Sequence, residues 1–364
     1  MKVGILTFHH SLNAGAALQA WALQEYLRSV GVATDIVNYG KIGWPSKYNL
    51  RADSLRHFVG SFYNGFNTFR RTLFIESYRR HLYRRFQRAC MGLGAAITKA
   101  DIPNLGYTHL ITGSDQIWHP VINEGDETYF LANVAPGVKR ISYAPSFGVD
   151  EFDHALERKM ADWLSRFDAL SVREPQGAAI VRRLCGREAT VVCDPTLLLP
   201  RTAYERIERP PRFGLPKRYV AVYTVCGHPW AESAALQLGE QMNLPVVHLL
   251  GGQLARWYLP GKVNRVTALG PSEWLWFMHH ADYVVTNSFH GTVFSLLYHR
   301  PFTVALNGKV SDARMLTLLD GTGLESRAML TADGAKGMAS IDWRQVDGTV
   351  EEKARTGKVF LKLR

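Results

Sequence analysis

The feature that most constrains this chain is a repeated alternation of short, β-branched apolar runs with segments of helical periodicity. Strands that alternate with helices pair in parallel and are joined by right-handed crossovers, so an α/β fold is expected. Strands are predicted at 2–7, 33–38, 109–112, 140–144, 169–172, 190–193, 219–225, 246–250, 282–287 and 302–306. Helices are predicted at 16–30, 176–184, 292–298 and 350–363.

A proline-rich stretch at 194–216 separates these strands into two series. A chain of 364 residues is long enough for two domains that each bury a core. We therefore expect two Rossmann-like domains, at 1–200 and 201–340, that face each other across a cleft. The helical tail at 341–364 is expected to pack back across the domain junction.

Composition and motif spacing exclude several classes of protein. Hydrophobic residues make up 46% and charged residues 21%, which is typical of a soluble globular enzyme. No apolar run is long enough to span a membrane, and His9 and His10 interrupt the N-terminus too early for a secretory signal. A cytoplasmic protein is therefore expected. The four cysteines and the histidines lack the spacing of a metal site, so neither a metal nor another cofactor is predicted.

The positive charge is concentrated in one segment. The chain carries 43 Lys and Arg against 32 Asp and Glu, a net charge of +11. Residues 41–100 hold twelve of these bases and two of the acids, which leaves about +1 for the rest of the chain. Within 70–88, apolar residues and arginines each recur every four positions, which predicts an amphipathic helix. Its apolar residues are Phe74, Tyr78, Leu82 and Phe86, and its arginines are Arg80, Arg84 and Arg88.

Two interpretations of the helix at 70–88 remain open. In the simpler one the helix packs on its domain and its arginines are solvated. In the other the arginines contact an anionic membrane surface or a lipid-phosphate carrier. Nucleic acid is not an expected partner, because no nucleic-acid-binding motif accompanies the charge.

Polar residues gather where predicted strands end, which is where doubly wound sheets bind ligands. Asn13 lies in the glycine-containing loop after the first strand, and Ser146 follows the strand at 140–144. The strand at 109–112 leads into Asp115, Gln116 and Trp118. Polar groups beside an aromatic ring suit a sugar, so these five residues are predicted to bind an acceptor. The alternatives are an ordinary turn at Asn13 and a core position for Trp118.

Two further strand ends suggest an anion site. Arg173 can clamp a carboxylate or phosphate, or form an ion pair at the surface or domain interface. The run Ser-Phe-His-Gly at 288–291 follows a buried strand and opens a helix. Ser288, His290 and the Gly291 N–H would then lie at the positive end of that helix. A histidine there can act as a general acid near neutral pH, so we predict a functional His290.

In six runs that occur in order, the chain resembles bacterial polysaccharide pyruvyltransferases. The runs lie at 13–20, 113–118, 142–148, 171–174, 193–198 and 286–291. The resemblance extends from the N-terminus to about residue 330 and is weakest over 41–100.

This resemblance implies a GT-B-like fold and transfer of pyruvate from phosphoenolpyruvate onto two hydroxyls of one sugar, which gives a cyclic ketal and releases phosphate. It implies that His290 is the general acid. It also implies that arginines hold the donor, with Arg173 as the best match and Arg314 as a lesser candidate. The acceptor would be a sugar of a bacterial surface or extracellular polysaccharide, or its lipid-linked precursor, and the enzyme could then lie at the inner face of the membrane.

Two alternatives belong to other functional classes. One is a GT-B glycosyltransferase that uses a nucleotide sugar, and the other is a non-catalytic glycan-binding protein. Binding of a nucleotide diphosphate would favour the first, and glycan binding without turnover would favour the second.

Overall fold

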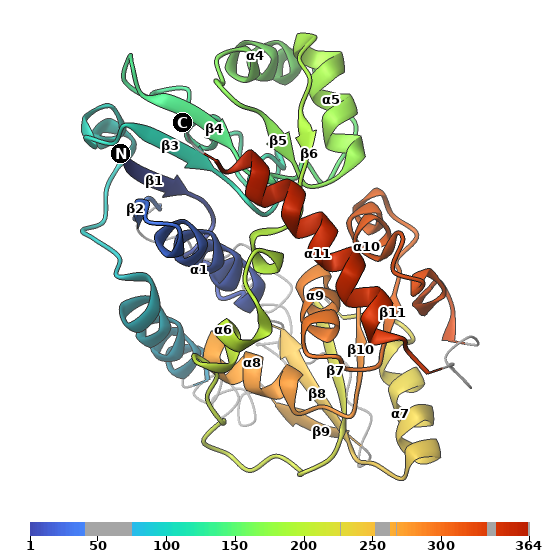
Figure 1. Cartoon of the computed structure of the whole chain (residues 1–364). Coiled ribbons are helices and arrows are strands. Elements are labelled where there is room, and N and C mark those ends of the chain that lie inside the picture. Colours follow the sequence, from blue (N-terminus) through green and yellow to red (C-terminus); the bar gives the residue numbers. More distant parts are fainter. Residues whose placement is uncertain (41–74, 226, 252–262, 267, 333–339, 363–364) are drawn as a thin grey trace, which may run out of the picture.

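A computed structural model describes residues 1–40, 75–225, 227–251, 263–266, 268–332 and 340–362. The described strands form two main sheets, and all their pairings are parallel. Figure 1 shows the N-terminal sheet above the C-terminal sheet, with helices between and around them. This is the predicted α/β architecture of two Rossmann-like domains.

The N-terminal sheet has the strand order β2-β1-β3-β4. A single parallel bridge between Ile141 and Ala169 connects it to the pair β5-β6, so the carboxyl ends of β3 to β6 lie along one edge. The strands are β1 (Lys2–Leu6), β2 (Ala33–Ile36), β3 (His109–Thr112), β4 (Lys139–Ser142), β5 (Ser171–Val172) and β6 (Thr190–Val191).

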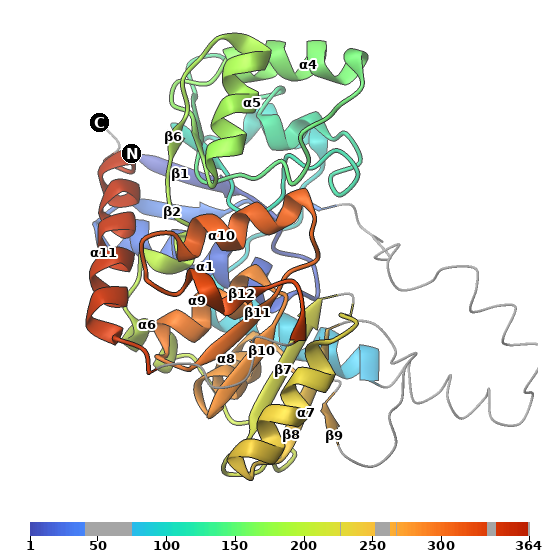
Figure 2. The ribbon, with the colours of Figure 1, turned by 90° about the vertical axis from the view of Figure 1, so that its right-hand side faces the viewer.

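The helix α1 (Ala14–Ser29) lies between the two sheets (Figure 1). It begins at Asn13, whose side chain accepts a hydrogen bond from the Ala16 N–H at 3.3 Å. Small alanine side chains on this helix are buried, which allows its close contact with both η4 (Pro195–Leu197) and α8 (Pro271–His279). Helices α4 (His154–Ser165) and α5 (Pro175–Cys185) pack together beside β5 and β6 (Figure 2).

The C-terminal sheet has the order β12-β11-β10-β7-β8-β9. All ten predicted strands form in the two domains, and the two that the prediction missed, β9 and β12, are the edge strands of this sheet. Its strands are β7 (Val220–Val225), β8 (Val246–Gly251), β9 (Val263–Val266), β10 (Tyr283–Thr286), β11 (Phe302–Ala305) and β12 (Ala328–Met329). Its other helices are α7 (Ala231–Met242), α9 (Phe289–Leu297) and α10 (Ala313–Leu319).

Two connections join the domains. After η4, the helix α6 (Arg201–Glu205) and residues 206–219 lead to β7. The last helix, α11 (Trp343–Phe360), crosses back along both domains, as predicted (Figure 1, Figure 2). Lys353 on α11 donates to the backbone carbonyl of Thr317 at 3.1 Å, and a Cβ at Gly357 would lie 2.4 Å from the Tyr143 hydroxyl of the N-terminal domain.

Part of the predicted basic helix is described, at 75–86, and η1 (Gln87–Met91) continues it. The amphipathic prediction is confirmed there, since Leu82 and Phe86 are buried whereas the side chains of Arg80, Arg84 and Arg88 are exposed. Of the other two apolar residues, Tyr78 is half-buried. Phe74 lies outside the described residues, as does the rest of 41–74.

Candidate functional site

The Ser-Phe-His-Gly run forms the predicted turn from a buried strand into a helix. Ser288 caps α9 by accepting a hydrogen bond from the Gly291 N–H at 3.2 Å. A Cβ at Gly291 would lie 2.4 Å from Thr286 Oγ1, so this helix start needs glycine to pack on β10. His290 is on the first turn of α9 and only 7% exposed. The Gly291 N–H and the Ser288 hydroxyl oxygen therefore hydrogen-bond to each other. Contact of either residue with a donor substrate stays a prediction.

The N-terminal end of α1 packs directly against the His290 ring. A Cβ at Gly15 would lie 2.1 Å from His290 Nδ1, so only a glycine permits this approach. The amino ends of α1 and α9, which come from different domains, thus converge on one imidazole. Helix amino ends carry unsatisfied N–H groups and partial positive charge, which favours an anion between them.

On its other side, His290 faces a buried carboxylate. Its Nε2 lies 3.7 Å from Oδ2 of Asp194, which follows β6 and is 1% exposed. Asp194 Oδ1 accepts hydrogen bonds from Thr196 N at 3.0 Å and Thr196 Oγ1 at 2.7 Å, and Ser114 Oγ donates to Oδ2 at 3.0 Å. These contacts fix the carboxylate in one orientation.

The charge state of Asp194 follows from these neighbours. Burial alone raises the pKa of its carboxyl group, because a charge is poorly solvated there. His290, Arg173 and Thr196 outweigh this effect and hold the pKa of Asp194 below its usual range. Asp194 is therefore an anion at neutral pH.

Arg173 lies beside the same carboxylate and is buried. Its Nη1 is 3.1 Å from Asp194 Oδ2, and its Nε is 3.7 Å from Glu174 Oε2. The guanidinium carbon lies 4.5 Å from the centre of the Phe289 ring, which belongs to the other domain. The ion-pair interpretation of Arg173 at the domain interface is therefore confirmed, and its role as a clamp for a substrate anion stays a prediction.

Several polar atoms here are buried without a hydrogen-bond partner. They are Arg173 Nε and Nη2, Glu174 Oε2 and His290 Nε2. Buried polar atoms are normally satisfied, so these atoms are available to a bound water or ligand. Arg173 supplies donors suited to a carboxylate or phosphate.

The C-terminal domain adds a second arginine. Burial, and then the positive charge of Arg173, lower the pKa of Arg314 to about 10. The carboxylates of Glu174 and Asp115 act in the opposite direction, so these charged groups lie near the Arg314 guanidinium. We call His290, Asp194, Arg173, Glu174 and Arg314 the junction cluster.

Four of the predicted acceptor residues have different contacts in the structure. Asp115 lies near Arg314, and Gln116 packs against Gly148, where a Cβ would lie 2.1 Å from its Nε2. Ser146 is buried and donates to Glu174 Oε1, so it joins the junction cluster indirectly. Asn13 serves as the cap of α1. No described contact tests acceptor binding by these four residues.

The prediction that Trp118 stacks on a sugar is wrong in this structure. Trp118 is 1% exposed, and its ring stacks on Phe130 with centroids 5.3 Å apart. Phe147 and Phe167 contact the same indole, whose Nε1 donates to the Tyr129 carbonyl at 3.1 Å. Both faces are covered, so the alternative of a core residue is the right one.

The sequence assigned no role to Asp194, and Glu174 was expected only as a possible ion-pair partner of Arg173. Asp194 was visible only as part of a matching run, yet one signal could have identified it. It follows the predicted strand at 190–193, and Arg173 follows the neighbouring strand, so both end at the same sheet edge.

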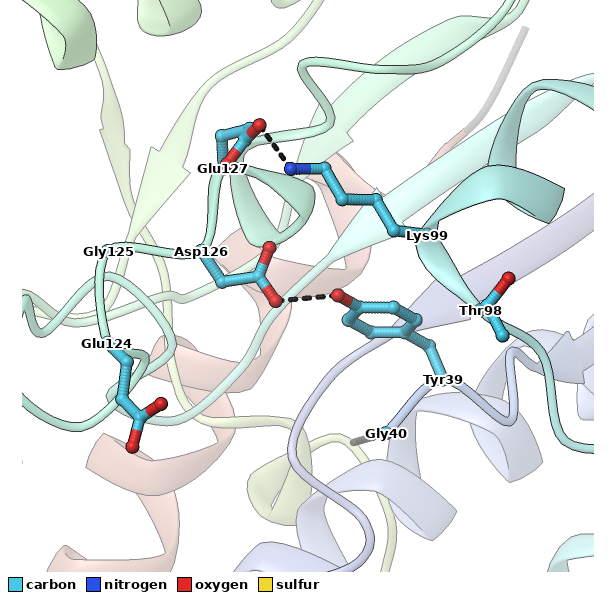
Figure 3. A pocket seen from close by; sticks show the side chains of 8 residues that line it. All are labelled: Tyr39, Gly40, Thr98, Lys99, Glu124, Gly125, Asp126 and Glu127. Carbon is cyan, nitrogen blue, oxygen red and sulfur yellow. Dashed lines mark hydrogen bonds and ion pairs between the residues drawn. The ribbon is translucent and has the colours of Figure 1, made fainter. Parts of the chain in front are cut away.

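A pocket of about 490 Å³ lies elsewhere on the N-terminal domain (Figure 3). Three of its charged groups have partners within the pocket, since Tyr39 donates to Asp126 Oδ2 at 2.6 Å and Lys99 pairs with Glu127. It contains none of the predicted site residues, and we assign it no function. It is lined by Tyr39, Gly40, Thr98, Lys99, Glu124, Gly125, Asp126 and Glu127.

In the described part of the chain, the side chains of Glu208, His279 and His280 have possible metal-ligand atoms within 4.8 Å of one another. This group shares no residue with the junction cluster. None of the described helices combines the length and apolar character that crossing a bilayer requires.

Comparison with known proteins identifies the family of the chain. The sequence model of the polysaccharide pyruvyl transferase family matches residues 13–308. No curated protein sequence matches the chain.

Solved structures of similar fold include a putative UDP-N-acetylglucosamine 2-epimerase from Listeria monocytogenes, with 8% identity, a TM-score of 0.50 and coverage of 100% of this chain and 90% of that one. A UDP-GlcNAc 2-epimerase from Methanocaldococcus jannaschii has 10% identity, a TM-score of 0.47 and coverage of 96% and 92%. The Anabaena protein HepE, in complex with UDP-glucose, has 11% identity, a TM-score of 0.47 and coverage of 98% and 100%. At these identities the likeness concerns the fold alone. The Listeria structure and the two parallel sheets confirm the GT-B-like architecture that the resemblance implied.

Proposed function

Because this chain belongs to the polysaccharide pyruvyl transferase family, we propose that it transfers pyruvate from phosphoenolpyruvate to two hydroxyls of one sugar, with a cyclic ketal and phosphate as products. The acceptor is a sugar of a bacterial surface or extracellular polysaccharide, or of its lipid-linked precursor. The reaction needs no metal or other cofactor in this proposal.

One observation carries the proposal. A buried guanidinium with two unsatisfied nitrogens, Arg173 Nε and Nη2, lies in the same cluster as an imidazole at the amino ends of two helices. Phosphoenolpyruvate is a small molecule with a carboxylate and a phosphate. Such an anion matches cationic donors and helix ends, and the Arg314 guanidinium supplies a second cation.

The proposed chemistry begins with proton transfer. Protonated His290 gives its proton to the methylene carbon of phosphoenolpyruvate, which becomes a methyl group and leaves C2 electron-poor. A sugar hydroxyl adds to C2 and loses its proton. Phosphate then leaves with the C2–O bonding pair, and a second hydroxyl adds to C2 and loses its proton to close the ring. One released proton restores His290 and the other leaves with phosphate, so the protons balance.

Asp194 has a supporting part in this scheme. As an anion 3.7 Å from His290 Nε2, it fixes the ring orientation. Asp115 near Arg314 is one candidate for accepting a hydroxyl proton, and no contact in the structure distinguishes it from other acids.

The exposed face of the helix at 75–86 and η1 supports a second part of the proposal. Arg80, Arg84 and Arg88 point away from the buried Leu82 and Phe86. We propose that this face contacts the anionic inner surface of the cell membrane, where a lipid-linked acceptor would be presented. The protein would then be cytoplasmic and peripheral.

The direct test is turnover. The protein is incubated with phosphoenolpyruvate and a panel of lipid-linked or nitrophenyl sugars, and phosphate release is measured together with the mass of the ketal product. Replacement of His290 by Ala is expected to reduce the rate by about 10²–10⁴ while the fold is kept. Absence of turnover by the folded wild-type protein on every acceptor would contradict the proposal. Binding of UDP would favour the alternative in which a nucleotide sugar is the donor.

A further inference from the structure

The described helix at 75–86 contains an arginine that does not belong to its exposed face. Arg79 is 7% exposed, whereas its neighbour Arg80 is exposed. Both pair with Glu76, at 3.7 Å for Arg79 and 3.2 Å for Arg80. Burying a guanidinium costs free energy unless it is paired and hydrogen-bonded. The contacts of Arg79 must therefore compensate the burial of its charge.

One contact joins Arg79 to the loop before α1. Its Nη2 donates to the backbone carbonyl of Leu12 at 3.0 Å. Leu12 lies one residue before the cap of α1, and Gly15 on the first turn of α1 packs against His290. A displacement of this loop would therefore move the surface on which the His290 ring rests.

Other contacts join the same helix to the C-terminal domain. Burial raises the pKa of Tyr223 on β7 and the Arg79 charge opposes this rise, which leaves the pKa at about 12. Nearby, Arg85 pairs with Glu273, and a Cβ at Gly270 would lie 2.7 Å from Leu82 Cβ.

We propose that Arg79 is a positioning residue that holds the amino end of α1 against the His290 ring at the start of α9. It acts through Leu12 and Gly15, while Arg85 and Leu82 of the same helix hold it to the C-terminal domain. The basic segment thus contributes to the site as well as to the outer surface. Its effect on turnover rests on the proposed function, whereas its effect on the His290 ring does not.

The test compares Arg79→Gln and Arg79→Lys with Arg28→Gln. Arg28 is a matched control because it also donates to a backbone carbonyl, that of Thr34 at 3.1 Å, but at the opposite end of α1. With a soluble acceptor, Arg79→Gln should reduce kcat by about 10²-fold, because a misplacement near 1 Å has that effect, while KM for phosphoenolpyruvate changes little. Arg79→Lys should recover part of kcat, and Arg28→Gln should match the wild type.

A second readout is independent of turnover. In ¹⁵N-histidine NMR spectra, assigned with a His290→Gln variant, the His290 ring signals should shift in Arg79→Gln and not in Arg28→Gln. Unchanged ring signals in Arg79→Gln, or a kcat equal to that of Arg28→Gln, would overturn the inference. If Arg79→Gln does not fold, the same comparison is made with Arg79→Lys. Shifted ring signals in Arg79→Gln, together with no turnover by the wild type, would support the positioning role of Arg79 and reject the proposed reaction.

Discussion

The imidazole Nε2 of His290 lies 3.7 Å from the carboxylate Oδ2 of Asp194, and the two residues come from different domains. The same oxygen is 3.1 Å from Arg173 Nη1. One buried carboxylate therefore contacts both the proposed acid and the proposed donor clamp. The pairing of the domains, rather than either domain alone, assembles the site.

Replacement of Asp194 by Asn should reduce kcat by about 10²-fold, since His290 loses the anion that orients it. The variant also leaves Arg173 with less compensation, so the unfolding free energy should fall by about 3–5 kcal/mol, as when a buried ion pair is broken. Steady-state kinetics and urea denaturation measure the two effects. Asp168→Asn serves as a control, because Asp168 pairs with Lys139 on the exposed surface. Wild-type kcat in Asp194→Asn would show that His290 acts without this carboxylate.

Arg173→Ala should chiefly weaken donor binding. Loss of a charge-assisted hydrogen bond costs about 1.5–3 kcal/mol, so KM for phosphoenolpyruvate should rise by roughly 10- to 100-fold. The matched control is Arg166→Ala, which removes an exposed arginine paired with Asp162. An unchanged donor KM in Arg173→Ala would reject the clamp and leave Arg173 as an interface residue only.

The amino end of α1 provides a steric test. Gly15→Ala would place a Cβ 2.1 Å from His290 Nδ1, so the ring must move. We expect kcat to fall by about 10²-fold and the unfolding free energy by about 1–3 kcal/mol, as in other overpacked sites. Gly348→Ala is the control, since a Cβ there meets nothing within 4 Å in α11. Activity of Gly15→Ala equal to that of Gly348→Ala would mean that the ring position is not critical.

The sequence predicted the strands well because their buried, β-branched runs are a local property. The same local pattern placed Arg173 and His290 at strand ends, where both approach the Asp194 carboxylate. Asp194 was not predicted as a site residue, because its role depends on partners in both domains. Trp118 was misassigned for a related reason, since its polar sequence neighbours say nothing of Phe130 and Phe147, which cover its ring.

His9, after β1, should make stability depend on pH. Burial and then the charge of His10 lower its pKa to about 4, from 6.5 in an unfolded chain. Below pH 6.5 the unfolded chain therefore binds a proton that the folded chain rejects until about pH 4, so stability falls as pH falls through this window. Between pH 7 and pH 5 the loss should be about 2 kcal/mol.

Urea denaturation at the two pH values measures this loss, and His9→Gln should show a smaller one. His154→Gln, at an exposed position on α4, should keep the wild-type pH dependence. Equal pH dependence in His9→Gln and wild type would show that His9 is not the group responsible.

The exposed arginines of the helix at 75–86 and η1 are expected to bind the protein to anionic membranes. Simultaneous Arg80→Glu, Arg84→Glu and Arg88→Glu should abolish cosedimentation with vesicles rich in phosphatidylglycerol, because each basic residue contributes about 1 kcal/mol at an anionic surface. Turnover of a soluble acceptor should be unaffected, whereas turnover of a lipid-linked acceptor in those vesicles should fall. The control has the same charge change at Arg158, Lys159 and Arg182, which are exposed on α4 and α5. If wild type and both triple variants bind the vesicles alike, or wild type does not bind at all, the arginine face is only solvated, as the simpler interpretation of the sequence states.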